Sequence, residues 1–407
     1  MNVLENLKNN IILLLYTVLV GIISGAIIWT FLKVMNLSID FFWDYLPGIV
    51  DFKYYTITVS LIGGLLIGLF KEKYGDATRE LKEVTRKVKK DHRYPYNNII
   101  PSIISAILPL TFGASVGPEA GLAGIIASLC TWASDKLKLF NKELEDLTAI
   151  GVSATLGVIF VSPLFAFVEP LENEEDVKLP KTSKNILYFA AILSSFAIFV
   201  LLNQLTGSKM GIQSLGNATL TNLNHIHILL LMLVGILLAY FYFITNKYVK
   251  MIFNKLGDSF ILKGIIGGLL LGIIGTILPL AMFSGEHQID IVMANGMEIG
   301  VVVLIVTAVM KIFLTNICIE SGLKGGHFFP LIFSGIAMGY AMSILLNTNV
   351  IIAASIVTTA LLSNILKKPI AVVLLLLILF PANLIPLMLL TAAVSCLFKT
   401  PEGLAVE

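Results

Sequence analysis

Charged residues are scarce in this chain, since only 13% of its 407 residues are Asp, Glu, Lys or Arg and 57% are apolar. Soluble domains have about a quarter charged and roughly half apolar residues, and the mean hydropathy here is +0.90. The ten-residue alternation of a porin-type barrel is also lacking. The composition therefore indicates a helical integral membrane protein surrounded by lipid. The net charge of +2 gives no indication of a nucleic-acid partner, and none is expected.

Cysteine and histidine are rare as well. The three cysteines lie far apart in apolar segments without metal-ligand spacing, and we expect them to be small buried side chains. The five histidines form no His-Glu-x-x-His pattern, and the spacing of His225 and His227 suits neither one helix face nor a metal site. We therefore expect no metal, no cofactor and no enzymatic activity. An intramembrane enzyme, which needs a converging nucleophile and base or a metal set, stays an alternative.

A cleavable leader and a soluble tail are not apparent. Lys8 precedes an apolar run from Ile11 past Trp29, which is long for a signal-peptide core and has no clear cleavage site after it. We expect a retained first span. The sequence stops at Glu407, shortly after the last apolar segment, so we expect no C-terminal soluble regulatory domain.

Apolar segments occur throughout the chain. They cover 11–32, 54–70, 97–112, 120–133, 147–163 with its continuation to 170, 186–205, 226–245, 262–282, 301–318, 331–346, 350–366 and 370–397. Several are shorter than the about 20 residues that an upright span needs, which predicts tilted, broken and re-entrant helices. Glycines at three- and four-residue spacing in 262–282 predict a close helix crossing.

Two polar stretches organise the chain. The stretch 71–93 is predicted to be one polar-faced helix, and its basic cluster favours the cytoplasmic side. The stretch 207–224 is rich in Gly, Asn and Thr and is predicted to be the loop between two membrane repeats, 1–206 and 225–407.

Two glycine-rich breaks, 113–119 and 321–330, interrupt the apolar sequence, one in each half. Glycine and proline interrupt the helical hydrogen bonds, so in a membrane such breaks must be buried in protein or line a watery cavity. Paired breaks of this kind indicate an ion or solute site near the bilayer midplane. Helix N-termini after them would offer N–H groups to a small anion without holding it too tightly to release. Loops between spans, or glycines needed only for packing, are the alternatives.

The breaks resemble two motifs of the CLC chloride channels and proton/chloride exchangers. Gly113-Ala-Ser-Val-Gly-Pro118 is similar to the family's Gly-Lys/Arg-Glu-Gly-Pro, and Gly326-His-Phe-Phe-Pro330 to its Gly-x-Phe-x-Pro. Likenesses at 151–164, 264–285 and 368–370 follow in the family's order. The resemblance implies an all-α fold of two inverted repeats of tilted, broken and re-entrant helices. It also implies a homodimer with one pore per subunit in the inner or plasma membrane, moving chloride or a similar small anion.

The resemblance further implies that backbone amides near the two motifs form the selectivity region. The predicted pore residues are Ser115, Val116, Gly117, Pro118, Gly326, His327, Phe328 and Phe329.

The sequence departs from the family pattern at functional positions. Val116 stands where the family has its gating glutamate, and Glu119 is the nearby carboxylate, either a first-turn helix acid or a displaced gate. Asp76 falls where the family's first motif has a serine, and is either a pore residue or a helix N-cap. Glu169 and Glu172 are candidates for an internal proton acceptor, or belong to a wet acidic loop.

Other polar residues leave alternatives open. His327 could titrate near neutral pH and gate the site, or it could be held by a loop carbonyl. Lys311 and Glu320 lie in or beside a span, in a buried charge pair or in a transport role. The family's pore tyrosine has no counterpart, because the chain ends near the start of the helix that carries it.

We therefore expect an anion channel or transporter. Valine at the gate position favours passive conduction over proton exchange. A proton-coupled exchanger that uses Glu119, and a homologue that has lost transport, are the alternatives.

Overall fold

The computed structural model describes residues 3–76, 79, 81–91, 93–137, 147–169, 172, 182–208, 214–218 and 224–399. Within these ranges the regular elements are helices, and the one β-type pairing is an isolated bridge between Gly117 and Gly326. The predicted all-α membrane fold is confirmed.

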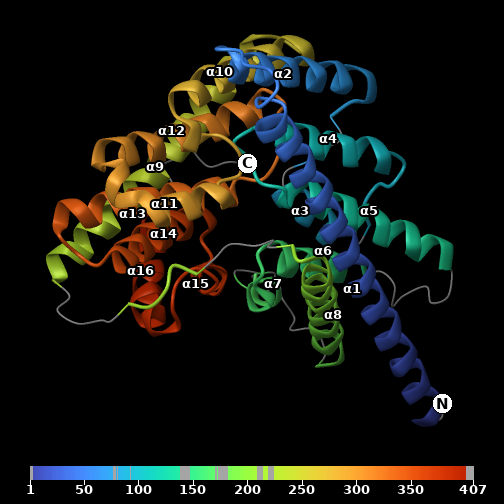
Figure 1. Cartoon of the computed structure of the whole chain (residues 1–407). Helices are drawn as coiled ribbons and strands as arrows, with labels where there is room; N and C mark the ends of the chain where they lie inside the picture. The colour runs from blue at the N-terminus through green and yellow to red at the C-terminus, as the bar shows by residue number, and fades with distance from the viewer. Residues whose placement is uncertain are drawn as a thin grey trace. The chain divides into compact units, whose positions relative to one another are not determined.

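The helices follow one another along the chain in the order that Figure 1 labels them. The first are α1 (Val3–Asp40) with a π-helical continuation (Phe41–Tyr45), α2 (Tyr55–Tyr74), α3 (Leu81–Asp91), α4 (Ile99–Thr111), α5 (Glu119–Leu137), α6 (Leu147–Ile159), α7 (Pro163–Val168) and α8 (Thr182–Thr206). The later ones are α9 (His225–Lys255), α10 (Phe260–Ile277), α11 (Glu286–Ile299), α12 (Val301–Glu320), α13 (Phe328–Leu346), α14 (Val350–Leu366), α15 (Pro369–Leu376) and α16 (Ile385–Leu397).

Seven helices of the described chain are long and apolar enough to cross a membrane, namely α1, α2, α8, α9, α10, α12 and α13. Shorter apolar helices, including α4, α6 and α14, accompany them. Large apolar side chains on α1, such as Leu15 and Leu19, are exposed, as lipid contact requires. The predicted mixture of full spans and shorter helices is confirmed.

Contacts group the chain into two compact units. The first contains Met1–Met35, Thr78–Ile104 and Glu119–Gly211, and the second contains Asn36–Ala77, Ser105–Pro118 and Ile212–Glu407. In the first unit α6 packs between α5 and α8. A Cβ on Gly151 of α6 would lie 2.4 Å from the Cys130 sulfur of α5, so glycine permits this close packing.

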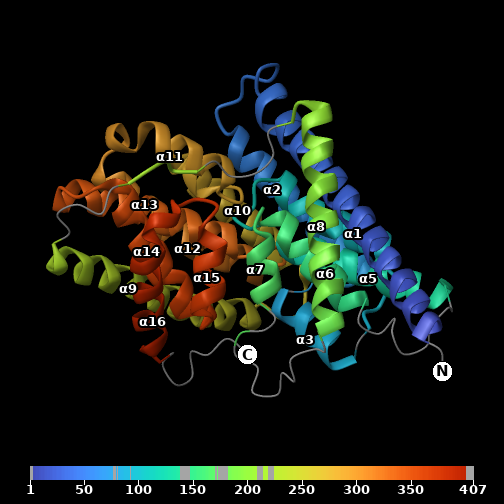
Figure 2. The same ribbon diagram turned by 90° about the horizontal axis from the view of Figure 1, so that it is seen from below.

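In the second unit α2 and α10 lie side by side (Figures 1 and 2). A Cβ on Gly64 would lie 2.1 Å from the carbonyl oxygen of Gly264, and one on Gly268 would lie 2.4 Å from that of Ser60. Only glycine allows the two backbones to approach so closely. The close crossing predicted for this glycine-rich segment is therefore confirmed.

The core of the second unit lies around α13 and α14, which pack on each other and on α12 and α9. Almost every side chain of α14 is buried, and a Cβ on Gly339 of α13 would lie 2.3 Å from the Cα of Ala354. Helix α13, which starts at Phe328 directly after the second break, is itself buried along most of its length.

Some predicted boundaries are wrong. The stretch 71–93 is not one helix, because Gly75 (φ +79°) ends α2 and α3 begins only at Leu81. Its predicted apolar face is confirmed, since Val84 and Val88 are buried. The segment 147–170 is divided, because Val161 (φ +47°) ends one helix and Pro163 starts the next.

Two spans also run further than predicted. Helix α1 continues to Asp40 and then into the π-helical turn, and α9 continues through the basic residues 246–250 to Lys255. The predicted repeat boundary at 207–224 stays a prediction. Of this stretch the structure describes 207–208, 214–218 and 224, where the Leu215 N–H donates to the Leu379 carbonyl at 2.8 Å.

Candidate functional site

The two breaks meet in the second unit. The Gly117 N–H donates to the Gly326 carbonyl at 2.7 Å, and the Gly326 N–H donates to the Gly117 carbonyl at the same distance. A Cβ on Gly325 would lie 2.5 Å from Cγ2 of Val116 and 2.7 Å from the Gly117 oxygen. Glycine is therefore required here, and the reciprocal bridge satisfies polar groups that two interrupted helices leave exposed.

The first break is a tight loop after α4. The Ala114 N–H donates to the Pro109 carbonyl at 2.9 Å, and the Val116 N–H donates to the Ala114 carbonyl at 2.8 Å. The Phe283 N–H donates to the Gly113 carbonyl at 3.0 Å. The backbone of this break is thus fixed from both sides, by its own turn and by the loop before α11.

The side chains of Ser115 and Val116 in the first break are completely buried. The Ser115 hydroxyl lies 3.2 Å from the Thr315 hydroxyl of α12, and the Val116 side chain packs against Gly325. The family's gate position therefore holds an apolar side chain with no proton to exchange.

Two of the backbone amides predicted to face an anion already have hydrogen-bond partners within the chain. The N–H groups of Val116 and Gly117 are both engaged within the chain. Phe328 and Phe329 lie in the first turn of α13, where the acceptors for N–H groups must come from outside the helix, and Pro330 has no N–H. The part that the first turn of α13 plays in the predicted selectivity region stays a prediction.

His327 is the N-cap residue of α13 and is 7% exposed. Its ring stacks on Phe328 with centroids 5.2 Å apart and lies 5.8 Å from the ring of Tyr242 on α9. Tyr242 is itself buried. The structure therefore adds an aromatic neighbour that the sequence analysis did not include, and the choice between the two roles of His327 stays open.

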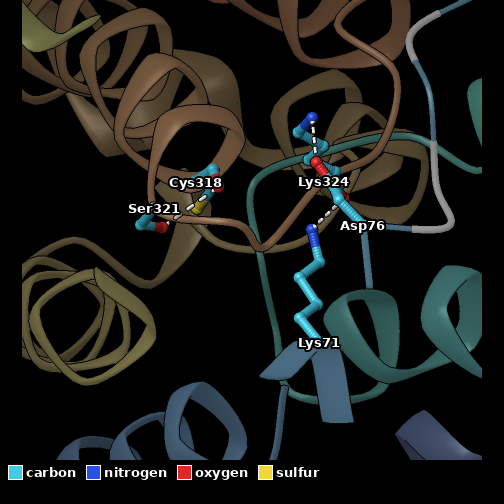
Figure 3. A network of polar contacts seen from close by, with 5 residues as sticks. All are labelled: Lys71, Asp76, Cys318, Ser321 and Lys324. Carbon is cyan, nitrogen blue, oxygen red and sulfur yellow. Dashed lines mark hydrogen bonds and ion pairs between the residues drawn. The ribbon is translucent and has the colours of Figure 1, made fainter. Parts of the chain in front are cut away.

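Asp76 lies beside the second break in a cluster with two lysines (Figure 3). One carboxylate oxygen is 2.7 Å from Nζ of Lys71, and the other is 2.6 Å from Nζ of Lys324. Burial raises the pKa of the Asp76 carboxyl, but the two ammonium groups more than offset this and hold the pKa below its ordinary value. The N-cap role is wrong, because α3 begins only at Leu81 and the carboxylate binds the lysines instead.

Lys311 is a second buried lysine, and it has no acidic group within ion-pair distance among the described residues. Its ammonium donates to the carbonyls of Met282 at 2.7 Å, Phe283 at 2.9 Å and Ala281 at 3.4 Å. It also lies 4.9 Å from the centroid of the Phe333 ring. Of the two alternatives for Lys311, the ion pair is not observed in the described chain.

The comparisons with known proteins agree with these features. The sequence profile described as voltage gated chloride channel matches residues 59–400. The chain belongs to the voltage-gated chloride channel family. The predicted membership of the CLC family is thereby confirmed.

Three similar proteins illustrate how far this CLC chain has diverged. A slow cyanobacterial Cl⁻/H⁺ antiporter superposes with a TM-score of 0.79 at 18% identity, covering 94% of this chain and 93% of that one. A CLC-type fluoride/proton antiporter superposes with a TM-score of 0.77 at 19% identity, covering 98% and 97%. The uncharacterized protein MJ0305 of Methanocaldococcus jannaschii is 26% identical over 71% of this chain and 70% of its own length.

The three gate or proton-coupling candidates of this CLC chain, Glu119, Glu169 and Glu172, lie in its first unit, whereas the bridged residues Gly117 and Gly326 lie in its second. Glu119 is the first residue of α5 and is fully buried. Glu169 directly follows α7 with a partly buried side chain, and the Glu172 N–H donates to the Val168 carbonyl at 3.2 Å. Their predicted roles stay predictions.

The sequence analysis did not identify Lys71 and Lys324 as site residues. Lys71 opens the polar stretch 71–93, and Lys324 lies within the second break, 321–330. The sequence predicts that Lys71 begins a polar-faced helix over 71–93, yet it belongs to α2 and is 2% exposed. The available signal was Gly75, whose position after a long apolar run favours a helix end and thereby places Lys71 inside the span.

Proposed function

We propose that this CLC protein moves chloride or a similar small anion across a cell membrane, guided by backbone N–H groups that follow the paired breaks. The observation that carries the proposal is the reciprocal Gly117–Gly326 bridge, which aligns both family motifs within one unit. Family membership over residues 59–400 supports it, as do the two antiporters of similar fold.

We favour passive conduction over strict exchange. Val116 is completely buried at the position where the family has its glutamate, and a hydrocarbon side chain can neither carry a proton nor compete with an anion. A pathway whose selectivity comes from partial charges allows the anion to leave as readily as it binds.

Proton-coupled exchange is the second candidate, and one observation favours it. Glu119 is buried at the start of α5, only three residues after the missing gate, and a carboxyl group inside a membrane is a functional candidate. The two antiporters of similar fold couple an anion to a proton.

Flux from liposomes separates the two candidates. Purified protein would be reconstituted with a proton gradient and no chloride gradient, and chloride movement would be recorded with an electrode. Passive conduction predicts no net uphill chloride movement. Stoichiometric uphill movement would establish exchange.

The Glu119→Gln variant sharpens this test. Exchange through Glu119 predicts that coupling disappears, whereas passive conduction predicts flux within about twofold of wild type. Glu298→Gln, at an exposed position near the end of α11, serves as the matched control. Absence of any anion flux from a protein shown to be folded would favour a homologue that has lost transport.

We also propose that the protein is a homodimer in the inner or plasma membrane, as its family membership suggests. Light scattering of the purified protein, corrected for bound detergent, would show the mass of two chains. A mass of one chain at working concentration would contradict this assembly.

A further inference from the structure

Helix α3 has one apolar face and one charged face. Val84 and Val88 are buried, whereas Arg86 and Lys90, one turn apart, are exposed. The helix contains five basic and two acidic residues. We propose that the exposed face of α3 binds the negatively charged phosphodiester headgroups of anionic membrane phospholipids. We call Arg86, Lys87 and Lys90 the basic face.

The apolar face of α3 packs on α5 within the first unit. A Cβ on Gly124 of α5 would lie 3.8 Å from Cγ2 of Val84 and 3.6 Å from the hydroxyl oxygen of Tyr94. These are ordinary van der Waals distances, so the two helices are in direct contact at this point. Because Val84 points toward α5, the exposed side chains of Arg86 and Lys90 point away from it.

The segment that follows α3 is bound to the C-terminal part of α5. The Tyr94 N–H donates to the Thr131 hydroxyl at 3.0 Å. Arg93 forms an ion pair with Asp135, which lies in the last turn of α5. The C-terminal ends of α3 and α5 therefore lie close together.

The end of α5 marks a boundary between lipid and water. The apolar part of α5 ends at Ala133, and Asp135 is the first charged residue after Glu119. Trp132, at this end, is 45% exposed, and tryptophan prefers the headgroup region of a membrane. Ile100, in the first turn of α4, is 71% exposed, as lipid contact requires. Since charged side chains avoid hydrocarbon, the basic face lies among the lipid headgroups.

The charge of this face selects anionic lipids. Basic residues clustered on an amphipathic helix beside a membrane-spanning segment attract anionic headgroups, which gather in the cytoplasmic leaflet. The same residues favour the cytoplasmic side for this stretch of the chain. Glu83 and Asp91 are also exposed, but they lie on either side of the basic face. Lys87 lies with Nζ 6.0 Å from the centroid of the Tyr94 ring, at the edge of a cation–π contact.

Native mass spectrometry of the purified protein in a non-ionic detergent tests the proposal, because it resolves each bound lipid by its mass. Titrations with phosphatidylglycerol and with phosphatidylcholine of the same acyl chains would give the apparent Kd of the first bound lipid. We expect phosphatidylglycerol, which is anionic, to bind about tenfold more tightly. A higher concentration of ammonium acetate should reduce this preference, because salt screens exposed charges.

Two double variants with equal loss of charge locate the binding. Arg86→Gln/Lys90→Gln should weaken phosphatidylglycerol binding about tenfold and leave phosphatidylcholine binding unchanged. Lys247→Gln/Lys250→Gln, two exposed lysines on α9 in the second unit, is the matched control and should bind both lipids as the wild type does. If the first double variant does not fold, Lys90→Gln alone should show a smaller loss in the same direction.

Two results would overturn the proposal. One is equal affinity of the wild type for the two lipids, which would leave the basic face free for another partner, such as an acidic protein. The other is an equal loss of phosphatidylglycerol affinity in the α3 variants and in the α9 control, which would show attraction by net charge without a site on α3.

Lipid binding at the basic face does not depend on the proposed function. The titrations record no transport, so a protein without anion flux could still show the lipid preference. Anion flux with equal affinity for both lipids would leave the proposed function standing and refute the basic face as a lipid site.

Discussion

Lys71 and Lys311 are two buried lysines of the same unit, yet they are stabilised in different ways. Lys71 is held by the Asp76 carboxylate, which it shares with Lys324. Lys311 is held by the carbonyls of Ala281, Met282 and Phe283, with no acid in reach among the described residues. The partner of Lys71 is a partly exposed side chain, whereas the partners of Lys311 are main-chain carbonyl dipoles.

This difference separates an exchangeable charge from a fixed one. A carboxylate on a partly exposed side chain can leave and be replaced, whereas three backbone carbonyls cannot move without refolding their loop. Phe283, one of the three, is held at φ +59° and donates its N–H to Gly113. We infer that Lys311 holds the loop that supports the first break.

The largest effect is expected from Lys311→Met. The change leaves three carbonyls without their shared donor, and buried polar groups without partners cost about 1–3 kcal/mol each. We expect a loss of stability of about 3 kcal/mol, visible as a lower midpoint of thermal unfolding in detergent. An unchanged or raised midpoint would show that desolvation of the ammonium outweighs these bonds, and the inferred supporting role would be wrong.

Gly325→Ala should have the next largest effect. Its Cβ would lie 2.5 Å from Val116 and 2.7 Å from the Gly117 oxygen, so the bridge between the breaks must open. We expect at least tenfold lower anion flux from liposomes. Gly124→Ala is the matched control, because its nearest contact would be 3.6 Å, an ordinary van der Waals distance. Normal flux from Gly325→Ala would show that the bridge is not needed for transport.

Lys71→Met should cost less than Lys311→Met, and this contrast tests the comparison directly. Asp76 keeps Lys324 as a partner, so no charge is left alone, and methionine fills most of the volume of the lysine stem. We expect a loss of about 1 kcal/mol by the same unfolding assay. If the two variants lose equal stability, then both lysines are structural.

The smallest effect concerns pH. Because the folded pKa of Asp76 lies below its ordinary value of 3.8, its ion pairs contribute stability that is present above about pH 4 and is lost as the pH falls through the folded pKa. Between pH 7 and pH 5 this carboxyl should not change the unfolding midpoint. Comparison of wild type with Asp76→Asn from pH 7 to pH 3 would show it, since the difference between them should shrink only in acid.

The sequence predicted the breaks, the family and the close crossing of α2 and α10 because each rests on local glycine and proline chemistry. It missed the ion-pair cluster of Lys71, Asp76 and Lys324 because Asp76 and Lys324 are 248 residues apart, and only folding brings them together. The sequence analysis ended the second span at Phe70 because charged residues follow it. Gly75, which favours a helix end, marks the true end of α2 and places Lys71 inside the helix. The carbonyl cage of Lys311 depends on the backbone conformation of another loop, which residue type does not reveal.

The bridge between Gly117 and Gly326 has a mechanical consequence. The two residues exchange two hydrogen bonds that run in opposite directions. Neither loop can therefore move relative to the other while both bonds are kept. Any rearrangement that accompanies anion passage must therefore either move both motifs as one body or break both bonds at once. The rate of such a rearrangement would then depend on the Gly117–Gly326 bridge as a single unit, and the two loops would not move independently.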